Sequence, residues 1–332
     1  MAKYKEIGGT PVAFKSGSEE YTYPSGAEGE LFYNSSNGQF QFVGLGAGTW
    51  ATGGNANTAR NIHQQVSTNG TQNASIIFGG DTPPRSAICE SYNGTAWTEV
   101  NNLQQVRVSG AGFGTATAAI MCNGNGSPGS PIADCESWNG TSWSEINNTP
   151  VRMAANGGSG TQTAGLSGGG QTNDIARGTF VEVYAFDGTN WTETGDLNTG
   201  RGIAPFFGTQ TASILASGQT DTASVANVEE FNGTSWTEIA EVNTVRQEHA
   251  AAGSVSTDAI IFAGSPTKAN TEAWNGTAWT EVNDLGTARY ALGGSGTGAL
   301  GLASLGTTGG SGRLTSTEEW TLAQPIKTVT TS

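Results

Sequence analysis

Six of the nine arginines in the chain recur at one place in an internal repeat. They are Arg60, Arg107, Arg152, Arg201, Arg246 and Arg289. In five repeats a glutamate stands seven or eight residues before the arginine: Glu99, Glu145, Glu193, Glu238 and Glu281. The planar guanidinium group can bind a carboxylate at two points, so this pattern favours structural ion pairs between the outer strand of one repeat and the inner strand of the next. The alternative is a ring of positive charge for an anion or an acidic sugar, which the glutamates would neutralise.

Further charged residues lie on segments that vary in length and composition from one repeat to the next. They are Asp81, Arg85, Asp174, Arg177, Asp221, Lys268 and Arg313. Binding residues usually lie on loops that a rigid scaffold holds in place. We therefore expect any ligand to bind at these loops, and the alternative is that the loops are solvated spacers.

The residue types used most often in catalysis are scarce. The two histidines, His63 and His249, lie far apart in the sequence, and we expect both to be ordinary strand residues. The three cysteines, Cys89, Cys122 and Cys135, are too few for a disulfide framework and are expected to be small buried side chains. No nucleophile, phosphate-binding or metal-binding motif occurs. The sequence thus predicts no enzymatic activity, no metal and no cofactor.

The repeat is marked by the pattern aromatic-Asn-Gly-Thr-x-Trp. Its tryptophan occurs at positions 50, 97, 143, 191, 236 and 279, with spacings of 47, 46, 48, 45 and 43 residues. This period suits a four-stranded propeller blade. In the first period we expect strands at 60–66, 74–78, 88–92 and 96–100, with an Asn-Gly turn between the last two.

The two ends of the repeat array complement each other. The last repeat, which begins at Arg289, has no strand-four tryptophan, whereas the copy around Trp50 has a strand four and nothing before it. We therefore predict an all-β protein with a six-bladed propeller at 46–323, which residues 46–53 close by pairing with the C-terminal strand. Residues 324–332 are expected to be a tail.

Residues 1–45 lie outside the repeat. Segments 30–34 and 39–43 flank Ser-Ser-Asn-Gly, which predicts a β-hairpin. A lone hairpin is marginally stable in water, so we expect this N-terminal arm to pack on the propeller or on another chain, including a second copy of the protein.

Charge and composition exclude several classes of partner. The chain has 14 basic and 28 acidic residues, and its net charge is −14. Binding to nucleic acid and to anionic membranes needs an excess of basic residues, so neither is expected. No apolar run approaches the length of a membrane span, about 18 residues, and the N-terminus shows no secretory signal.

The repeat resembles the kelch-type β-propeller family. The shared features are the paired glycines after strand two (79–80 and 168–169), an aromatic residue on strand three and a tryptophan about five residues later. The Thr/Gly/Asn-rich style and the arm Gly-Glu-Leu-Phe-Tyr-Asn are similar to kelch-like proteins of marine tailed bacteriophages. The chain lacks the His/Tyr ligand set that kelch-type copper oxidases need, so an oxidase is the weakest alternative.

The resemblance implies a non-enzymatic virion protein located at the tail or the capsid surface. The N-terminal arm would bind other virion proteins, and the propeller would decorate the particle or attach to a polysaccharide of the host surface. The alternative is a free carbohydrate-binding, lectin-like propeller.

Overall fold

The computed structural model describes residues 31–34, 39–43, 46–66, 71–172, 180–310, 312–322 and 326–328. All regular structure in this part of the chain is β, which confirms the predicted class. No helix in it could cross a lipid bilayer. The chain divides into two compact units, Thr49–Thr321 and Met1–Gly48 with Leu322–Ser332.

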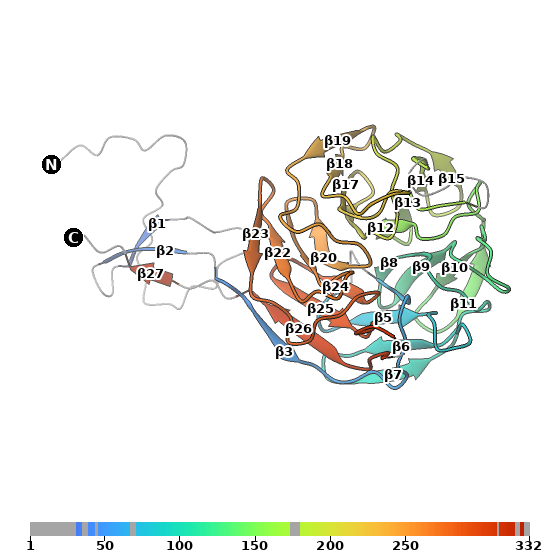
Figure 1. The fold of residues 1–332 in the computed structure, drawn as a ribbon, viewed down its shortest axis with the longest axis horizontal. Helices are drawn as coiled ribbons and strands as arrows, with labels where there is room; N and C mark the ends of the chain where they lie inside the picture. Colours follow the sequence, from blue (N-terminus) through green and yellow to red (C-terminus); the bar gives the residue numbers. More distant parts are fainter. Residues whose placement is uncertain are drawn as a thin grey trace. The chain divides into compact units, whose positions relative to one another are not determined.

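The larger unit is a six-bladed β-propeller of four-stranded antiparallel sheets (Figure 1). The first blade contains β4 (Gln64–Gln65), β5 (Ser75–Phe78), β6 (Cys89–Tyr92) and β7 (Trp97–Val100). The second contains β8 (Ala111–Thr115), β9 (Ala118–Cys122), β10 (Cys135–Trp138) and β11 (Trp143–Ile146). The third contains β12 (Gly157–Thr161), β13 (Ala164–Gly168), β14 (Val183–Phe186) and β15 (Trp191–Glu193).

The second half of the ring repeats this order. The fourth blade contains β16 (Phe206–Thr209), β17 (Ala212–Ala216), β18 (Val228–Phe231) and β19 (Trp236–Ile239). The fifth contains β20 (Ala250–Val255), β21 (Asp258–Phe262), β22 (Thr271–Trp274) and β23 (Trp279–Val282). The sixth contains β24 (Gly293–Gly296), β25 (Leu300–Ser304), β26 (Thr317–Thr321) and, from the other end of the propeller sequence, β3 (Thr49–Thr52).

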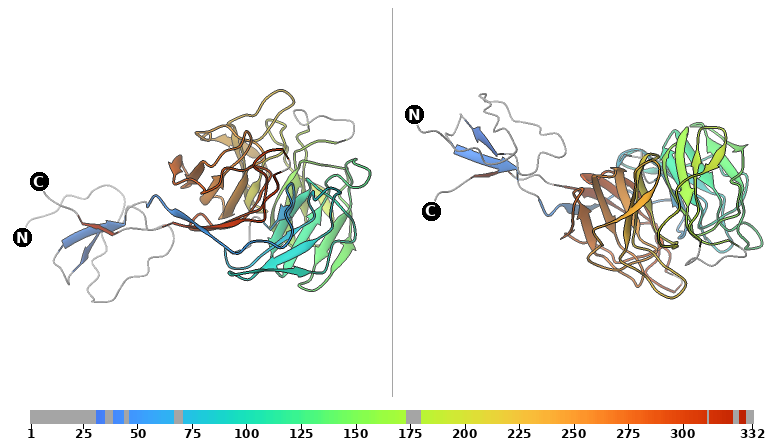
Figure 2. Two further views of the ribbon diagram at one scale, coloured as in Figure 1. Left: turned by 60° about the horizontal axis from the view of Figure 1, so that its bottom comes forward. Right: turned by 90° about the horizontal axis from the view of Figure 1, so that it is seen from above.

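Strand β3 closes the ring as predicted. It pairs antiparallel with β26, with Trp50 opposite Trp320 and Thr49 opposite Thr321. Figure 2 shows the blue β3 lying along the red strand of the last blade. The last blade therefore obtains a fourth strand, which protects the edge of β26 from pairing with another chain.

The core consists of the spaces between blades. The second strand of each blade, such as β5 or β9, is buried because both of its faces contact a neighbouring sheet. The strand-four tryptophans pack under the preceding blade, and the indole N–H of Trp97 donates to the Thr317 hydroxyl at 2.9 Å. The same N–H of Trp50 donates to Thr271 at 3.1 Å. At these two positions the Trp packs its ring against the preceding blade and still satisfies its polar group, whereas the buried indole N–H groups of Trp143 and Trp236 have no hydrogen-bond partner in the described ranges.

The first strand of each blade begins later than predicted. In the first blade β4 covers only Gln64–Gln65, and Arg60 lies on the segment that crosses over from the preceding blade. The reason is that Ile62 has a left-handed φ of 52°, which no regular strand contains.

The smaller unit contains a three-stranded sheet with the order β1 (Leu31–Asn34), β2 (Gln39–Val43) and β27 (Ile326–Thr328). The predicted hairpin is present as β1 and β2, with Leu31 opposite Phe42. Strand β27 pairs with β2, so part of the expected tail belongs to the same sheet as the arm. Both ends of the chain therefore meet in one sheet.

Candidate functional site

Five arginines of the repeat form buried ion pairs with glutamates of the third strand in their own blade. The pairs are Arg60–Glu90 (3.1 Å), Arg107–Glu136 (2.6 Å), Arg201–Glu229, Arg246–Glu272 (2.5 Å) and Arg289–Glu318. All ten residues are buried. Each carboxylate also accepts backbone N–H groups from the crossover segment; Glu90, for example, accepts from Asn57 at 2.7 Å and Thr58 at 3.3 Å. The ion pairs therefore anchor the crossovers to the blades.

The predicted partners of these arginines are wrong. Glu99, Glu145, Glu193, Glu238 and Glu281 are all exposed on the outermost strands. Most of them lie directly opposite the glutamate that does form the pair, as Glu99 lies opposite Glu90 and Glu281 opposite Glu272. The third strand lies one position nearer the axis, beneath the crossover, so its carboxylate meets the arginine and the outer carboxylate stays in water.

Arg152 is the exception among the six arginines, because its side chain is exposed. Met153, which is fully buried, occupies the corresponding place in the third blade, and Tyr184 occupies the place of the glutamate. The crossover residue whose N–H would reach that glutamate is Pro150, which has no N–H to donate. The missing pair was visible in the sequence, since the distance from the strand-four tryptophan to the arginine is ten residues in the other five repeats and nine in this one.

The buried arginines are not available to a ligand. Burial lowers the pKa of Arg201, while the hydrogen bond and charge of Glu229 raise it again. Its guanidinium also donates to the carbonyl groups of Ser217 and Leu215, at 2.9 and 3.1 Å. The arginines that could have formed an anion-binding ring thus form ion pairs and hydrogen bonds inside the protein.

Two closed rings of backbone hydrogen bonds join the blades around the axis. In the outer ring a glycine at the second position after strand two donates to the carbonyl of the arginine, or Met153, in the next blade. The donor–acceptor distances for Gly80–Arg107, Gly124–Met153, Gly170–Arg201, Gly218–Arg246, Gly264–Arg289 and Gly306–Arg60 are 2.8 to 3.2 Å. This explains the paired-glycine signature, because the second position has φ between 86° and 119° in all six blades.

The inner ring is formed by residues two positions after each arginine, or after Met153. They are Ile62, Ser109, Ala155, Ile203, Glu248 and Ala291, and all six have φ between 52° and 57°. Each N–H donates to the carbonyl of its counterpart in the preceding blade, at 2.7 to 3.3 Å, and Ile62 closes the circle on Ala291. Residues other than glycine are strained in this left-handed backbone conformation. The hydrogen bonds between neighbouring blades therefore hold the six residues in a conformation that they would not adopt alone.

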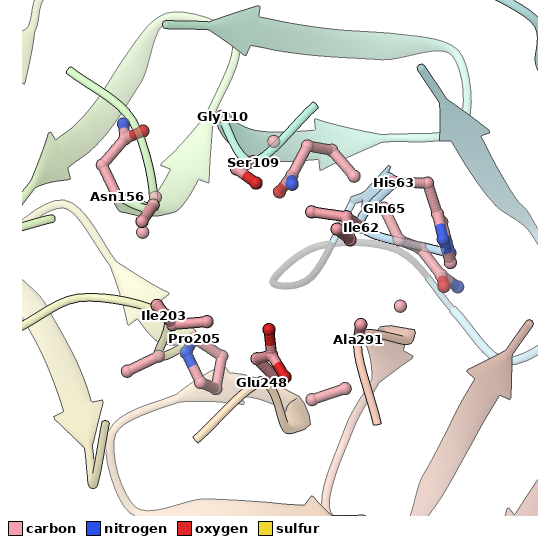
Figure 3. Close-up of a pocket in the computed structure, with 18 of the residues that line it drawn as sticks. Ile62, His63, Gln65, Ser109, Gly110, Asn156, Ile203, Pro205, Glu248 and Ala291 are labelled. Atoms are coloured by element: carbon pink, nitrogen blue, oxygen red, sulfur yellow. The ribbon is translucent and has the colours of Figure 1, made fainter. Parts of the chain in front are cut away.

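The inner ring surrounds the mouth of a cavity of about 320 Å³ on the propeller axis (Figure 3). It opens on the face that carries the crossovers, because it is lined by the beginnings of the innermost strands. Ile62, Ile203, Pro205, Ser109 and Glu248 contribute side chains to its wall. Asn125 and Gln171 extend the lining from the loops between strands two and three. This cavity is a concave site that the sequence did not predict.

The expectation that both histidines are strand residues is wrong, because His63 lies one residue before β4 and His249 one residue before β20. Both occupy buried positions at the cavity wall. Burial, with a contribution from the charge of Arg60, lowers the pKa of His63 to about 3. The pKa of His249 is also well below its usual value, through burial and the charge of Arg246. Both imidazoles are therefore neutral at physiological pH. His63 interacts with the Ser304 hydroxyl of the sixth blade at 3.3 Å.

The cysteines are buried thiols, as predicted. Burial raises the pKa of Cys89 to about 12 and that of Cys135 well above its usual value. Within the described part of the chain, no three His, Cys, Asp or Glu side chains are grouped to hold a metal ion.

Two of the loop arginines expected to contact a ligand connect neighbouring loops. Arg313 of the sixth blade forms an ion pair with Asp81 of the first blade at 2.5 Å. Arg85 of the first blade donates to the Gly126 carbonyl of the second blade at 2.6 Å. Lys268 is half-buried, with its backbone paired to Arg289, and Asp221 is exposed. Asp174 and Arg177 lie outside the described residues.

The chain matches no protein-family model and no curated protein. The architecture itself is that of a six-bladed β-propeller, and it is consistent with a propeller of the kelch type.

Proposed function

We propose that this protein is a non-enzymatic structural component of a tailed-bacteriophage particle. The sheet of β1, β2 and β27 attaches the chain to other virion proteins, and the propeller is displayed at the tail or capsid surface for decoration or host attachment. The observation that carries this proposal is that β2 pairs with a strand from each end of the chain. Both ends of the propeller sequence thereby lead into one small module, as an appendage attached at a single point requires.

The properties of the propeller support a display role. Its blades are joined by two backbone rings, and five buried ion pairs anchor the crossovers, which suits a part exposed to shear and to the medium. Arg85 and Arg313 connect neighbouring loops of the sixth, first and second blades, so these loops hold one another in place. The kelch-like repeat and the Gly-Glu-Leu-Phe-Tyr-Asn arm point to the phage setting, and host polysaccharide is the partner that we assign to the crossover face.

The attachment role is tested by removing residues 1–45. This deletion removes β1 and β2 but leaves β3, so the propeller remains closed. We expect a folded protein with an unchanged propeller melting temperature that no longer enters phage particles. Normal incorporation of the shortened chain would refute attachment through this sheet.

The location is tested by immunogold electron microscopy with an antibody against the propeller. Gold at the tail or fibre tips supports host attachment, and gold spread over the head supports decoration. Particles without gold would overturn the virion assignment.

A free carbohydrate-binding propeller is the second candidate, and the axial cavity favours it. This candidate predicts that the protein binds host polysaccharide equally well with and without residues 1–45. Loss of polysaccharide binding together with loss of particle incorporation in the shortened chain would instead favour the virion proposal.

A further inference from the structure

The axial cavity has an uneven distribution of charge. Among its lining residues that the structure describes, Glu248 supplies the one carboxylate, and none is lysine or arginine. The two histidines of the wall are neutral, because burial lowers the pKa of both. The protein as a whole carries a net charge of −14. The cavity therefore disfavours anions and attracts cations.

Glu248, which is half-buried, does not serve the structural role of the buried glutamates. It lies in the inner ring, where the equivalent residues are Ile, Ser, Ala, Ile and Ala, and where a left-handed φ is required. The ring uses only the backbone, so a carboxylate is not needed to build it. Figure 3 shows this side chain directed into the cavity. Glu248 also has interactions within the protein, and a ligand would add to them.

The wall opposite Glu248 is suited to a hydroxyl-bearing ligand. Ser109 belongs to the second blade and Glu248 to the fifth, so they face each other across the ring of six, and both point into the cavity (Figure 3). Ile62 and Ile203 face each other in the same way from the first and fourth blades. The mouth thus presents a carboxylate, a hydroxyl and two apolar side walls.

We propose that the axial cavity binds a small polyhydroxylated amine, of which an aminosugar is the simplest example. The ammonium group donates to the Glu248 carboxylate, a hydroxyl group of the ligand pairs with Ser109, and the C–H faces of the ring contact Ile62 and Ile203. The cavity volume, about 320 Å³, lies at the lower end of the usual range for small-molecule sites, about 300–1,000 Å³. This inference concerns a site within the isolated propeller and does not depend on a virion location.

The test compares glucosamine with glucose by isothermal titration calorimetry on the full chain, below the pKa of the amine. The two sugars differ in one group, an ammonium in place of a hydroxyl. We expect glucosamine to bind at least about tenfold more tightly than glucose, and Glu248→Gln to weaken glucosamine binding by at least about tenfold, which corresponds to about 1.4 kcal/mol.

Two further variants make the result specific. Glu241→Gln removes an exposed carboxylate from a crossover loop of the same face and should leave binding unchanged. Ser109→Leu keeps the Glu248 charge but fills the cavity from the opposite wall and should abolish binding. Thermal unfolding verifies that each variant is folded. Equal affinity for both sugars, no heat with glucosamine at millimolar concentration, or unchanged binding by a folded Glu248→Gln variant would overturn the proposal.

Discussion

Met153 and Tyr184 occupy, in the third blade, the places that an arginine and a glutamate hold in the other five. Both are buried in one apolar cluster with Phe113 and Trp191. Buried ion pairs stabilise little compared with apolar residues of similar volume, because both charges lose their hydration. The propeller therefore tolerates an apolar pair at one of six equivalent sites, provided that both partners change together.

Removing one partner of an ion pair should be far more harmful than removing an exposed carboxylate. We expect Glu272→Gln to lower the free energy of unfolding by about 3–5 kcal/mol, because the Arg246 guanidinium remains buried without its counter-charge. Glu281→Gln, at the exposed position opposite Glu272, should change it by less than about 0.5 kcal/mol. Equilibrium denaturation measures both, and equal effects would contradict the assigned pairing.

Copying the third blade into the fifth should rescue part of that loss. The double variant Arg246→Met with Glu272→Tyr should be more stable than either single variant, because no unpaired charge is left in the interior. It should remain below the wild type, because Asn243 and Thr244 still direct their N–H groups at the place of the lost carboxylate. Adding Asn243→Pro removes one of these donors, as Pro150 does in the third blade. A double-mutant cycle measures the coupling energy between positions 246 and 272. If the losses of the two single variants simply add in the double variant, the predicted rescue is wrong.

The neutral histidines should make the propeller sensitive to acid. The pKa of His63 is about 3 in the folded protein, whereas the ordinary histidine value of 6.5 applies to the unfolded chain, so the unfolded chain binds more protons between these values. The contribution of neutral His63 to the free energy of unfolding is fully present above pH 6.5. It decreases as the pH falls toward 3, by up to about 1.4 kcal/mol for each pH unit. The melting temperature of His63→Gln should fall less steeply over this interval than that of the wild type. Parallel curves for the two proteins would contradict the assignment.

The closing strand should be essential, whereas the arm should not. Deleting residues 1–53 removes β3 and leaves the edge of β26 unpaired, with Trp320 deprived of its contact with Trp50. We expect this protein to aggregate or to lose its cooperative thermal transition. The chain that lacks only residues 1–45 should remain monodisperse in size-exclusion chromatography with light scattering. Identical behaviour of the two deletions would show that β3 does not hold the ring closed.

The repeat period was sufficient to predict the propeller. Six tryptophans at intervals of 43 to 48 residues, with an Asn-Gly or Asp-Gly turn before most of them, require a four-stranded unit repeated around a ring. The missing strand four of the last repeat required closure from the other end of the array. These features are local or periodic, and packing does not change them.

The partner of each arginine depended on position across a blade. Glu90 lies on the third strand of the first blade and Glu99 lies opposite it on the fourth. Only the third strand lies under the crossover that carries Arg60, so Glu90 forms the ion pair. A cross-strand neighbour differs by one strand width in space and by nine residues in sequence, so spacing alone chose the wrong glutamate. Arg152 shows how strictly the place is defined, because a shift of one residue, readable as nine residues from Trp143 in place of ten, exchanges a buried place for an exposed one.

The axial cavity and its inner ring had no sequence signature of their own. The inner ring is built from Ile, Ser, Ala and Glu residues that share only a backbone conformation, and that conformation is stable because six blades close a circle of hydrogen bonds. In the same way, the pairing of β27 with β2 joins segments from opposite ends of the chain. The closure of the inner ring and the pairing of β27 with β2 are properties of the assembled ring and the assembled sheet, which is why these two features became visible only in three dimensions.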